Sequence, residues 1–373
     1  MDTLAQLLEQ SGLANIGIGN LVMFGVAGVL IFLAITKNYE PLLLIPIGFG
    51  AILANLPLAN MGAYGEGIMA LVYENGIRTE LLPPLIFLGV GALTDFRPLL
   101  GRPLTFLLGA AAQFGIFAAA LAAFYLMGFT GPEAGAIGII GGADGPTSIF
   151  LASQLAPHLL GPIAVAAYSY MSLVPIIQPP IMRMLTSKKE RAIDMPQAIP
   201  VSQTAVILFP IVTGILASLA IPTAAPLIGL LMFGNLLRES GVTERLRKTA
   251  GGPMIDIVTI FLALAVGATM SSENFLTWST IGILVLGAVA FSFSTAGGIV
   301  FAKILNLFLK RKINPCIGAA GVSAVPMSAR VVQKFVSDET DGRVNPLMPA
   351  MGPNVAGVIG SAVAAGVFLT LLG

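Results

Sequence analysis

The stretch GGADGPTSIF, residues 141–150, places one carboxylate, Asp144, between glycines and a proline within a long apolar region. An ionised carboxylate at the centre of a bilayer costs at least about 2.5–3.5 kcal/mol, and it usually marks the path of an ion or a proton. Gly145 and Pro146 interrupt a helix here, and interrupted backbone at membrane depth survives only where protein or a water-filled cavity satisfies its polar groups. The stretch therefore predicts a broken membrane helix that carries a functional carboxylate.

The composition of the whole chain supports a membrane location. Of its 373 residues 56% are hydrophobic and 10% charged, whereas soluble domains carry about 25% charged residues. Apolar runs long enough to cross a bilayer recur from end to end, so we predict an all-α polytopic membrane protein with about ten to eleven membrane segments, including broken or re-entrant helices. One cysteine, Cys316, and one histidine, His158, exclude a disulfide within the chain and predict no transition-metal site. The net charge of +1 predicts no nucleic-acid partner.

The basic residues indicate an orientation. Cytoplasmic loops are enriched in Lys and Arg. Placing the N-terminus outside brings the basic residues in 97–102, 188–191, 238–248 and 310–312 to one side, and only Arg78 falls clearly on the other. We therefore expect the N-terminus to lie outside.

A second interrupted stretch, residues 314–334, resembles the first. GIIGGADGPTS (138–148) and GAAGVSAVPMS (318–328) share Gly at the first and fourth positions, Pro at the ninth and Ser at the eleventh. Three further matches keep the same order: VGA at 90–92 and 266–268, FG at 49–50 and 233–234, and LGPIAVAAYS (160–169) and MGPNVAGVIG (351–360).

With the orientation above, these two repeats cross the membrane in opposite directions. We expect an N-terminal segment and first membrane helix in 1–39, a first inverted repeat in 40–185, a connecting loop and linking helix in 186–224, and a second inverted repeat in 225–373. In secondary transporters such repeats place broken helices around a binding site near the bilayer midplane, so the two tips should meet there. The predicted helix-breaking residues are Gly142, Gly145, Pro146, Gly318, Gly321, Pro326, Gly352 and Pro353.

The residues at the tips favour a sodium site that can also hold a proton. Asp144 has no Lys or Arg nearby in its own segment, which leaves a bound cation or a proton as its partner. Hydroxyls, amides and freed carbonyls supply the uncharged oxygens that hard cations prefer. Besides Asp144, the candidate sodium ligands are Thr147, Ser148, Asn314, Ser323 and Asn354, and Ser328 and Tyr170 lie in the same segments.

Simpler roles remain open for several of these residues. Asp144 could cap a helix beside the Gly-Pro turn. Ser323 and Ser328 could be small residues at helix contacts, and Tyr170 could be an interfacial anchor. Arg330, just past the second break, could receive a substrate carboxylate or be an ordinary cytoplasmic basic residue.

Three motifs, GGADGPTSIF, NPCIGAAGVSAVPMSAR and MGPNVAGVIGSAVAAG, together closely resemble the membrane beta subunit of the sodium-pumping biotin-dependent decarboxylases. This family includes oxaloacetate, glutaconyl-CoA, methylmalonyl-CoA and malonate decarboxylases. The resemblance implies a subunit of the bacterial cytoplasmic membrane that decarboxylates carboxybiotin, exports sodium and takes up an external proton. It implies as partners a biotin carrier protein, which holds the biotin, a carboxyltransferase alpha subunit and a small membrane gamma or delta subunit. It also implies that this chain forms a homo-oligomer.

The resemblance also implies roles for single residues. Asp144 would be the principal sodium ligand, with Asn314 and Ser323 in the second half of the ion path. Tyr170 and Ser323 would handle protons, and Arg330 would orient carboxybiotin, which makes these three the candidate catalytic residues. The competing interpretation is a sodium-coupled secondary transporter or a sodium/proton antiporter without decarboxylase activity, because such proteins also use inverted repeats and a midplane carboxylate.

Overall fold

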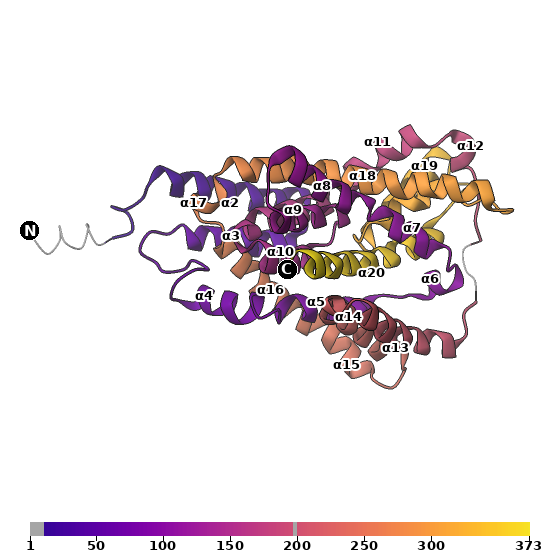
Figure 1. The fold of residues 1–373 in the computed structure, drawn as a ribbon, viewed down its shortest axis with the longest axis horizontal. Helices are drawn as coiled ribbons and strands as arrows, with labels where there is room; N and C mark the ends of the chain where they lie inside the picture. The colour runs from indigo at the N-terminus through magenta and orange to yellow at the C-terminus, as the bar shows by residue number, and fades with distance from the viewer. Residues whose placement is uncertain (1–10, 197–199) are drawn as a thin grey trace, which may run out of the picture.

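The computed structural model describes residues 11–196 and 200–373, and every regular element in this part of the chain is a helix (Figure 1). Seven helical segments within it are long and apolar enough to cross a membrane, and a pair bent by 64°, Ile68–Ile77 and Leu82–Leu93, makes eight if it forms one span. The chain is thus a polytopic membrane protein. The seven segments are α2 (Ile18–Lys37), α7–α8 (Thr105–Met127), η3–α11 (Pro157–Leu185), α13 (Gln203–Ala220), α15–η5–α16 (Glu244–Ala268), α18 (Trp278–Phe308) and α20 (Leu347–Leu372).

The expected ten to eleven segments included shorter and broken helices, which this length criterion leaves out. Among them are α3 (Pro41–Ala54) and α14 (Ala225–Glu239), which are too short to cross a full bilayer when perpendicular to it. The remaining short elements are α4 (Ile68–Val72), η1 (Tyr73–Ile77), α5 (Leu82–Leu93), α6 (Arg97–Gly101), α9 (Gly131–Gly138), η2 (Ile139–Gly142), α10 (Gly145–Leu155), α12 (Lys188–Arg191), η4 (Pro222–Ala224), α17 (Ser272–Phe275), η6 (Pro315–Gly321) and α19 (Met327–Glu339).

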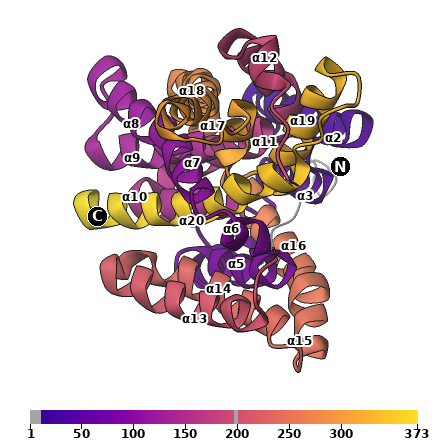
Figure 2. The same ribbon diagram turned by 90° about the vertical axis from the view of Figure 1, so that its right-hand side faces the viewer.

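The helices form two groups on either side of α20 (Figure 2). One group holds α5 and α13–α16, and the other holds α7–α12, α18 and α19. Within the first group α5 packs on α14, and α16 of this group packs on α3. Both pairs are tied by a buried asparagine at the crossing: the Asn235 amide donates to the Thr94 carbonyl at 2.9 Å, and the Asn55 amide donates to the Met270 carbonyl at 2.7 Å.

Glycines allow these two helix pairs to touch backbone to backbone. A Cβ atom on Gly91 would overlap the Leu231 carbonyl, and one on Gly234 would overlap the Leu88 carbonyl. At the other crossing, a Cβ on Gly50 would overlap the Leu264 carbonyl, and one on Gly267 the Ile47 carbonyl. These are the glycines of the matching FG and VGA motifs, and each crossing joins an FG glycine to a VGA glycine.

Two interrupted segments cross in the second group. The first runs through α9 (Gly131–Gly138), η2 (Ile139–Gly142) and α10 (Gly145–Leu155). It breaks because Ala143 adopts a left-handed conformation with φ of 52°, and Asp144 then caps α10 with Pro146 in the first turn. The second runs through η6 (Pro315–Gly321) and α19 (Met327–Glu339), with non-helical residues 322–326 between them.

Most of the predicted helix-breaking residues lie at these breaks, but Gly352 and Pro353 do not. Both lie inside α20, which is continuous from Leu347 to Leu372, so the prediction of a break there is wrong. Proline removes one backbone donor, and neighbouring helices make this tolerable in membrane helices. Gly352 instead gives room for a close approach of Thr105 on α7.

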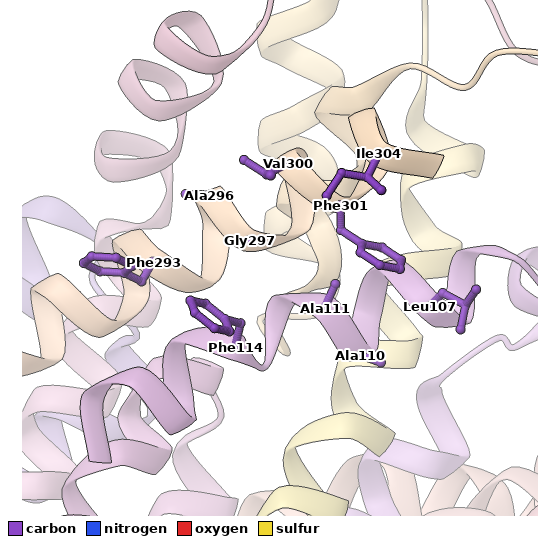
Figure 3. A pocket seen from close by; sticks show the side chains of 10 residues that line it. All are labelled: Leu107, Ala110, Ala111, Phe114, Phe293, Ala296, Gly297, Val300, Phe301 and Ile304. Carbon is purple, nitrogen blue, oxygen red and sulfur yellow. The ribbon is translucent and has the colours of Figure 1, made fainter. Parts of the chain in front are cut away.

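An apolar groove of 660 Å³ lies between α7–α8 and α18 (Figure 3). Its walls include Phe114 from α8 and Phe293, Gly297 and Phe301 from α18. None of the candidate site residues lines this groove, and it offers no polar side chain to an ion.

Candidate functional site

Asp144 is buried at the N-terminus of α10, with 6% of its surface exposed. Its Oδ1 accepts a hydrogen bond from the Thr147 backbone N–H at 3.2 Å, so the expected helix cap is present. Its Oδ2 accepts a hydrogen bond at 2.6 Å from the hydroxyl of Ser361 on α20. No described Lys, Arg or His forms an ion pair with it. The cap therefore does not neutralise the carboxylate, and a cation or a proton can still do so.

The tips of the two interrupted segments meet beside Asp144. The Ser323 backbone N–H donates to the Gly142 carbonyl at 2.8 Å. The Ser323 hydroxyl donates to the Gly357 carbonyl at 2.8 Å and lies 2.9 Å from the Ser361 hydroxyl. Ser361 thus connects Ser323 to Asp144, and the structure brings together the two candidate residues that the sequence places 179 positions apart.

Thr147 and Ser148 are both fully buried in the first turn of α10, but their hydroxyls differ. Ser148 Oγ donates to the carbonyl of Asp144 at 2.7 Å, which is a local helix contact. Thr147 Oγ1 has no hydrogen-bond partner among the described residues. Because a buried polar atom without a partner is uncommon and costly, Thr147 is the better candidate for an ion ligand.

Asn354 holds the second tip. Its amide nitrogen donates to the carbonyls of Ala320 at 3.0 Å and Val322 at 2.8 Å, while its Oδ1 has no partner in the described structure. Asn354 lies two helical turns before Ser361, on the same face of α20 and about 10 Å away along the axis. A neutral oxygen is thus left without a partner here, as is the hydroxyl oxygen of Thr147.

Tyr170 does not contact the Asp144 segment in any described hydrogen bond. Its hydroxyl donates to the Leu284 carbonyl on α18, and its ring packs on Gly287. The tyrosine beside the break is Tyr168, whose ring packs so tightly on Gly145 that a Cβ there would overlap it. The Tyr168 side chain is fully buried, and its hydroxyl has no partner among the described residues.

Asn314 lies at the far end of η6 from the tip. Its Oδ1 caps η6 by accepting from the Cys316 N–H at 3.1 Å. Its amide nitrogen donates to the carbonyls of Arg191 at 2.9 Å and Ile193 at 3.2 Å. These bonds fasten η6 to the segment after α12, and none of them links Asn314 to Asp144 or Ser323.

Arg330 occupies the first turn of α19, seven residues after Ser323. It is exposed and forms no ion pair with a described residue. Its guanidinium is therefore available to a carboxylate from outside the chain. Ser328, two residues earlier, is instead buried and bonded to Gln178 of α11 at 2.8 Å.

Ser361, Gln178 and Tyr168 are polar contacts of the crossing that the sequence analysis did not single out. Gln178 donates to the Ala319 carbonyl of η6 at 2.8 Å. The available signal was a polar side chain inside an otherwise apolar span, which requires a partner at membrane depth. Gln113, between α7 and α8, is a fourth such residue.

An ion cluster fixes the C-terminal end of α19. Glu339 accepts from Arg183 at 2.8 Å and from Arg191 at 2.7 Å. The Arg183 hydrogen bond, followed by that from Arg191, holds the pKa of Glu339 below its ordinary value of 4.5. Arg191 is also the residue whose carbonyl binds Asn314, so this cluster supports η6 as well.

We expect this cluster to make stability depend on pH. Because folding lowers the pKa of Glu339, the ionised carboxylate stabilises the fold fully above the ordinary pKa of 4.5. This stabilisation is lost as the pH falls through the folded-state pKa. The fall in melting temperature between about pH 5 and pH 3 should be smaller in Glu339→Gln than in the wild type. The matched control is Asp338→Asn, the adjacent exposed carboxylate outside the ion pairs, which should follow the wild type. An unchanged profile in Glu339→Gln would contradict the assignment.

Comparison with known proteins identifies the family. A family profile described as "Na+-transporting oxaloacetate decarboxylase beta subunit" matches residues 19–372. The chain belongs to this family of decarboxylase beta subunits. It shares 51% identity with oxaloacetate decarboxylase beta chain 2 of Salmonella typhi across 99% of both chains. It shares 55% identity with the methylmalonyl-CoA decarboxylase beta subunit of Veillonella parvula, across 98% of this chain and 96% of the relative. Identity with the glutaconyl-CoA decarboxylase beta subunit of Acidaminococcus fermentans is also 55%, across 99% and 98%.

This membership gives the broad role of the chain: it is a membrane subunit of a decarboxylase complex from a sodium-transporting family. The relatives act on different acids and acyl-CoA compounds at similar identity. The substrate of the complex is therefore not distinguished by similarity to this subunit.

Proposed function

We propose that this chain decarboxylates carboxybiotin carried by a partner protein, and couples that reaction to outward sodium transport and uptake of an external proton. The observation that carries the proposal is the hydrogen-bonded series Ser323–Ser361–Asp144, which joins both interrupted segments at one unneutralised carboxylate. The unpartnered oxygens of Thr147 and Asn354 add neutral donors of the kind that sodium binds.

In this mechanism Asp144 holds sodium and a proton in turn. With sodium bound, the carboxylate is ionised; with sodium released, a proton neutralises it, because a bare carboxylate is costly at membrane depth. Decarboxylation breaks the bond between the carboxyl carbon and the biotin nitrogen, and the nitrogen receives one proton as CO2 leaves. Ser323 connects Asp144 to the second segment and stands seven residues from Arg330, whose free guanidinium would orient the carboxylate of carboxybiotin.

Coupling requires that the reaction does not run without transport. Moving one charge outward against about 100 mV costs about 2.3 kcal/mol. A site that keeps water out and delivers a proton only on sodium exchange would meet this requirement. The proton is proposed to pass by way of Ser323 and Tyr170, the two hydroxyl-bearing candidates.

We further propose that residues 40–185 and 225–373 are two inverted repeats, with 186–224 as the link and the N-terminus outside. The equivalent glycine contacts of the α5–α14 and α3–α16 pairs support this arrangement. The family supports a complex in the bacterial cytoplasmic membrane with a biotin carrier, a carboxyltransferase alpha subunit and a small gamma or delta subunit, and a homo-oligomeric beta chain. A rigid crosslink between the repeats that left sodium transport intact would rule out alternating access by relative movement.

The test is CO2 release from free carboxybiotin by the purified protein in proteoliposomes. We expect release above the protein-free background only when sodium is present on the side from which it is taken up, together with sodium movement into the opposite compartment. The proposal would be overturned if the protein moved sodium but released no CO2 above background, either with or without sodium. That result would favour the secondary transporter.

A further inference from the structure

Gln113 is a buried polar residue at the break between α7 (Thr105–Ala112) and α8 (Phe114–Met127), with 4% of its surface exposed. Its amide nitrogen donates to the Gly109 carbonyl at 2.9 Å within its own span. The same nitrogen lies 3.3 Å from the Gly321 carbonyl at the end of η6. Its Oε1 has no hydrogen-bond partner among the described residues. Both nitrogen bonds are explained by helix packing, but the bare oxygen is not.

The position of the Gln113 amide relates this oxygen to Asp144. The amide lies against Gly360, next to Ser361. A Cβ atom on Gly142 would lie 3.5 Å from Gln113 Oε1 and 3.3 Å from the Ser361 Cβ. Gly142 is two residues before Asp144, and Ser361 donates to Asp144. The nitrogen of the amide therefore faces the second tip, and its oxygen faces the first.

Charge explains why an oxygen should be left free at this place. A carboxylate repels an amide oxygen, so Gln113 Oε1 and Asp144 gain nothing from each other directly. A cation between them is attracted to both, and sodium accepts neutral oxygens together with a carboxylate. Thr147 Oγ1, also unpartnered and on the Asp144 turn, completes a set of one charged and two neutral donors.

We propose that Gln113 Oε1 is a neutral ligand of the cation held by Asp144, and that the Gln113 nitrogen ties this ligand to the second tip through Gly321. The inference rests on the proposed function, since it requires a sodium ion at Asp144. It adds a third element, the α7–α8 break, to the two interrupted segments that the sequence identified. Binding of sodium would then order three segments at once.

The experiment measures the melting temperature of the full-length protein in detergent as sodium chloride replaces choline chloride at constant ionic strength. Gln113→Met keeps the length of the side chain but removes both polar atoms. We expect half-maximal stabilisation to need about tenfold more sodium than in the wild type, because one neutral ligand is lost. Gln113→Asn, which keeps the amide but withdraws it by one methylene group, should shift in the same direction and decides the question if Gln113→Met does not fold.

Asn235 offers a matched control. It is a buried amide on α14 that also donates to carbonyls and also leaves its oxygen unpartnered, but it lies at the α5–α14 crossing. Asn235→Leu should lower the melting temperature without changing the sodium concentration for half-maximal stabilisation. Equal shifts in Asn235→Leu and Gln113→Met, or no shift in either Gln113 variant while the wild type responds, would overturn the inference. A wild type that does not respond to sodium would overturn the sodium site itself.

Discussion

Asp144→Asn should remove the sodium dependence of both transport and CO2 release. The substitution keeps the size of the side chain but removes the one charge available to the cation, so sodium affinity should fall by about a hundredfold. The amide can still interact with Thr147 and Ser361, so the fold should persist. Sodium titrations of thermal stability and of CO2 release in proteoliposomes both measure the effect.

Asp256→Asn is the control for removing a carboxylate from a membrane segment. Asp256 is exposed in the first turn of α16, away from the crossing. Its replacement should leave the sodium dependence unchanged. If Asp144→Asn retained wild-type sodium affinity, Asp144 would be a helix cap and nothing more.

Gly145→Ala should strongly destabilise the crossing. The added Cβ would overlap the ring of Tyr168, which is fully buried and cannot move aside without displacing its neighbours. We expect a loss of about 3 kcal/mol in the free energy of unfolding, at the upper end of the usual cost of overpacking. The measurement is thermal unfolding of the detergent-purified protein, with sodium affinity as a second readout because Asp144 is the adjacent residue.

Two comparisons separate this steric effect from a general intolerance of alanine. Gly28 in α2 has no heavy atom within 4 Å of a built Cβ, so Gly28→Ala should be neutral or slightly stabilising. In a Tyr168→Leu background the cost of Gly145→Ala should be smaller, because residues in contact do not add independently. Equal costs in both backgrounds would show that the ring is not the obstacle.

The candidate site shows where sequence reasoning reaches its limit. Asp144 and Ser323 could be identified because a carboxylate and a Gly-Pro break are conspicuous in apolar sequence, and their meeting followed from the repeated motif. Tyr168 and Tyr170 could not be told apart in this way. They lie two positions apart and thus point about 200° apart around α11, and only the packing of α11 on α10 determines which one reaches the break.

Asn314 and Ser361 also show that a sequence motif does not determine which residues meet at the crossing. Asn314 belongs to a motif of the second segment, yet its side chain is used at the end of η6 far from the tip. Ser361 belongs to no interrupted segment, yet it donates directly to Asp144. The position of a residue along a helix determines its level along the helix axis. The sequence motif alone does not indicate which neighbouring helix contacts the residue at that level.

The sequence by itself determined that this is a helical membrane protein, that two segments are interrupted, and that the carboxylate at one break needs a partner, because solvation cost and backbone chemistry are local properties. Only the tertiary structure decided which side chains surround that carboxylate. Ser361 and Gln113 come from spans distant in sequence, and Gly352 and Pro353 lie in a continuous helix because neighbouring helices support it. Such contacts depend on the rotation of each helix about its axis and on the angles at which helices cross. Both are determined by packing between segments that are distant in the sequence.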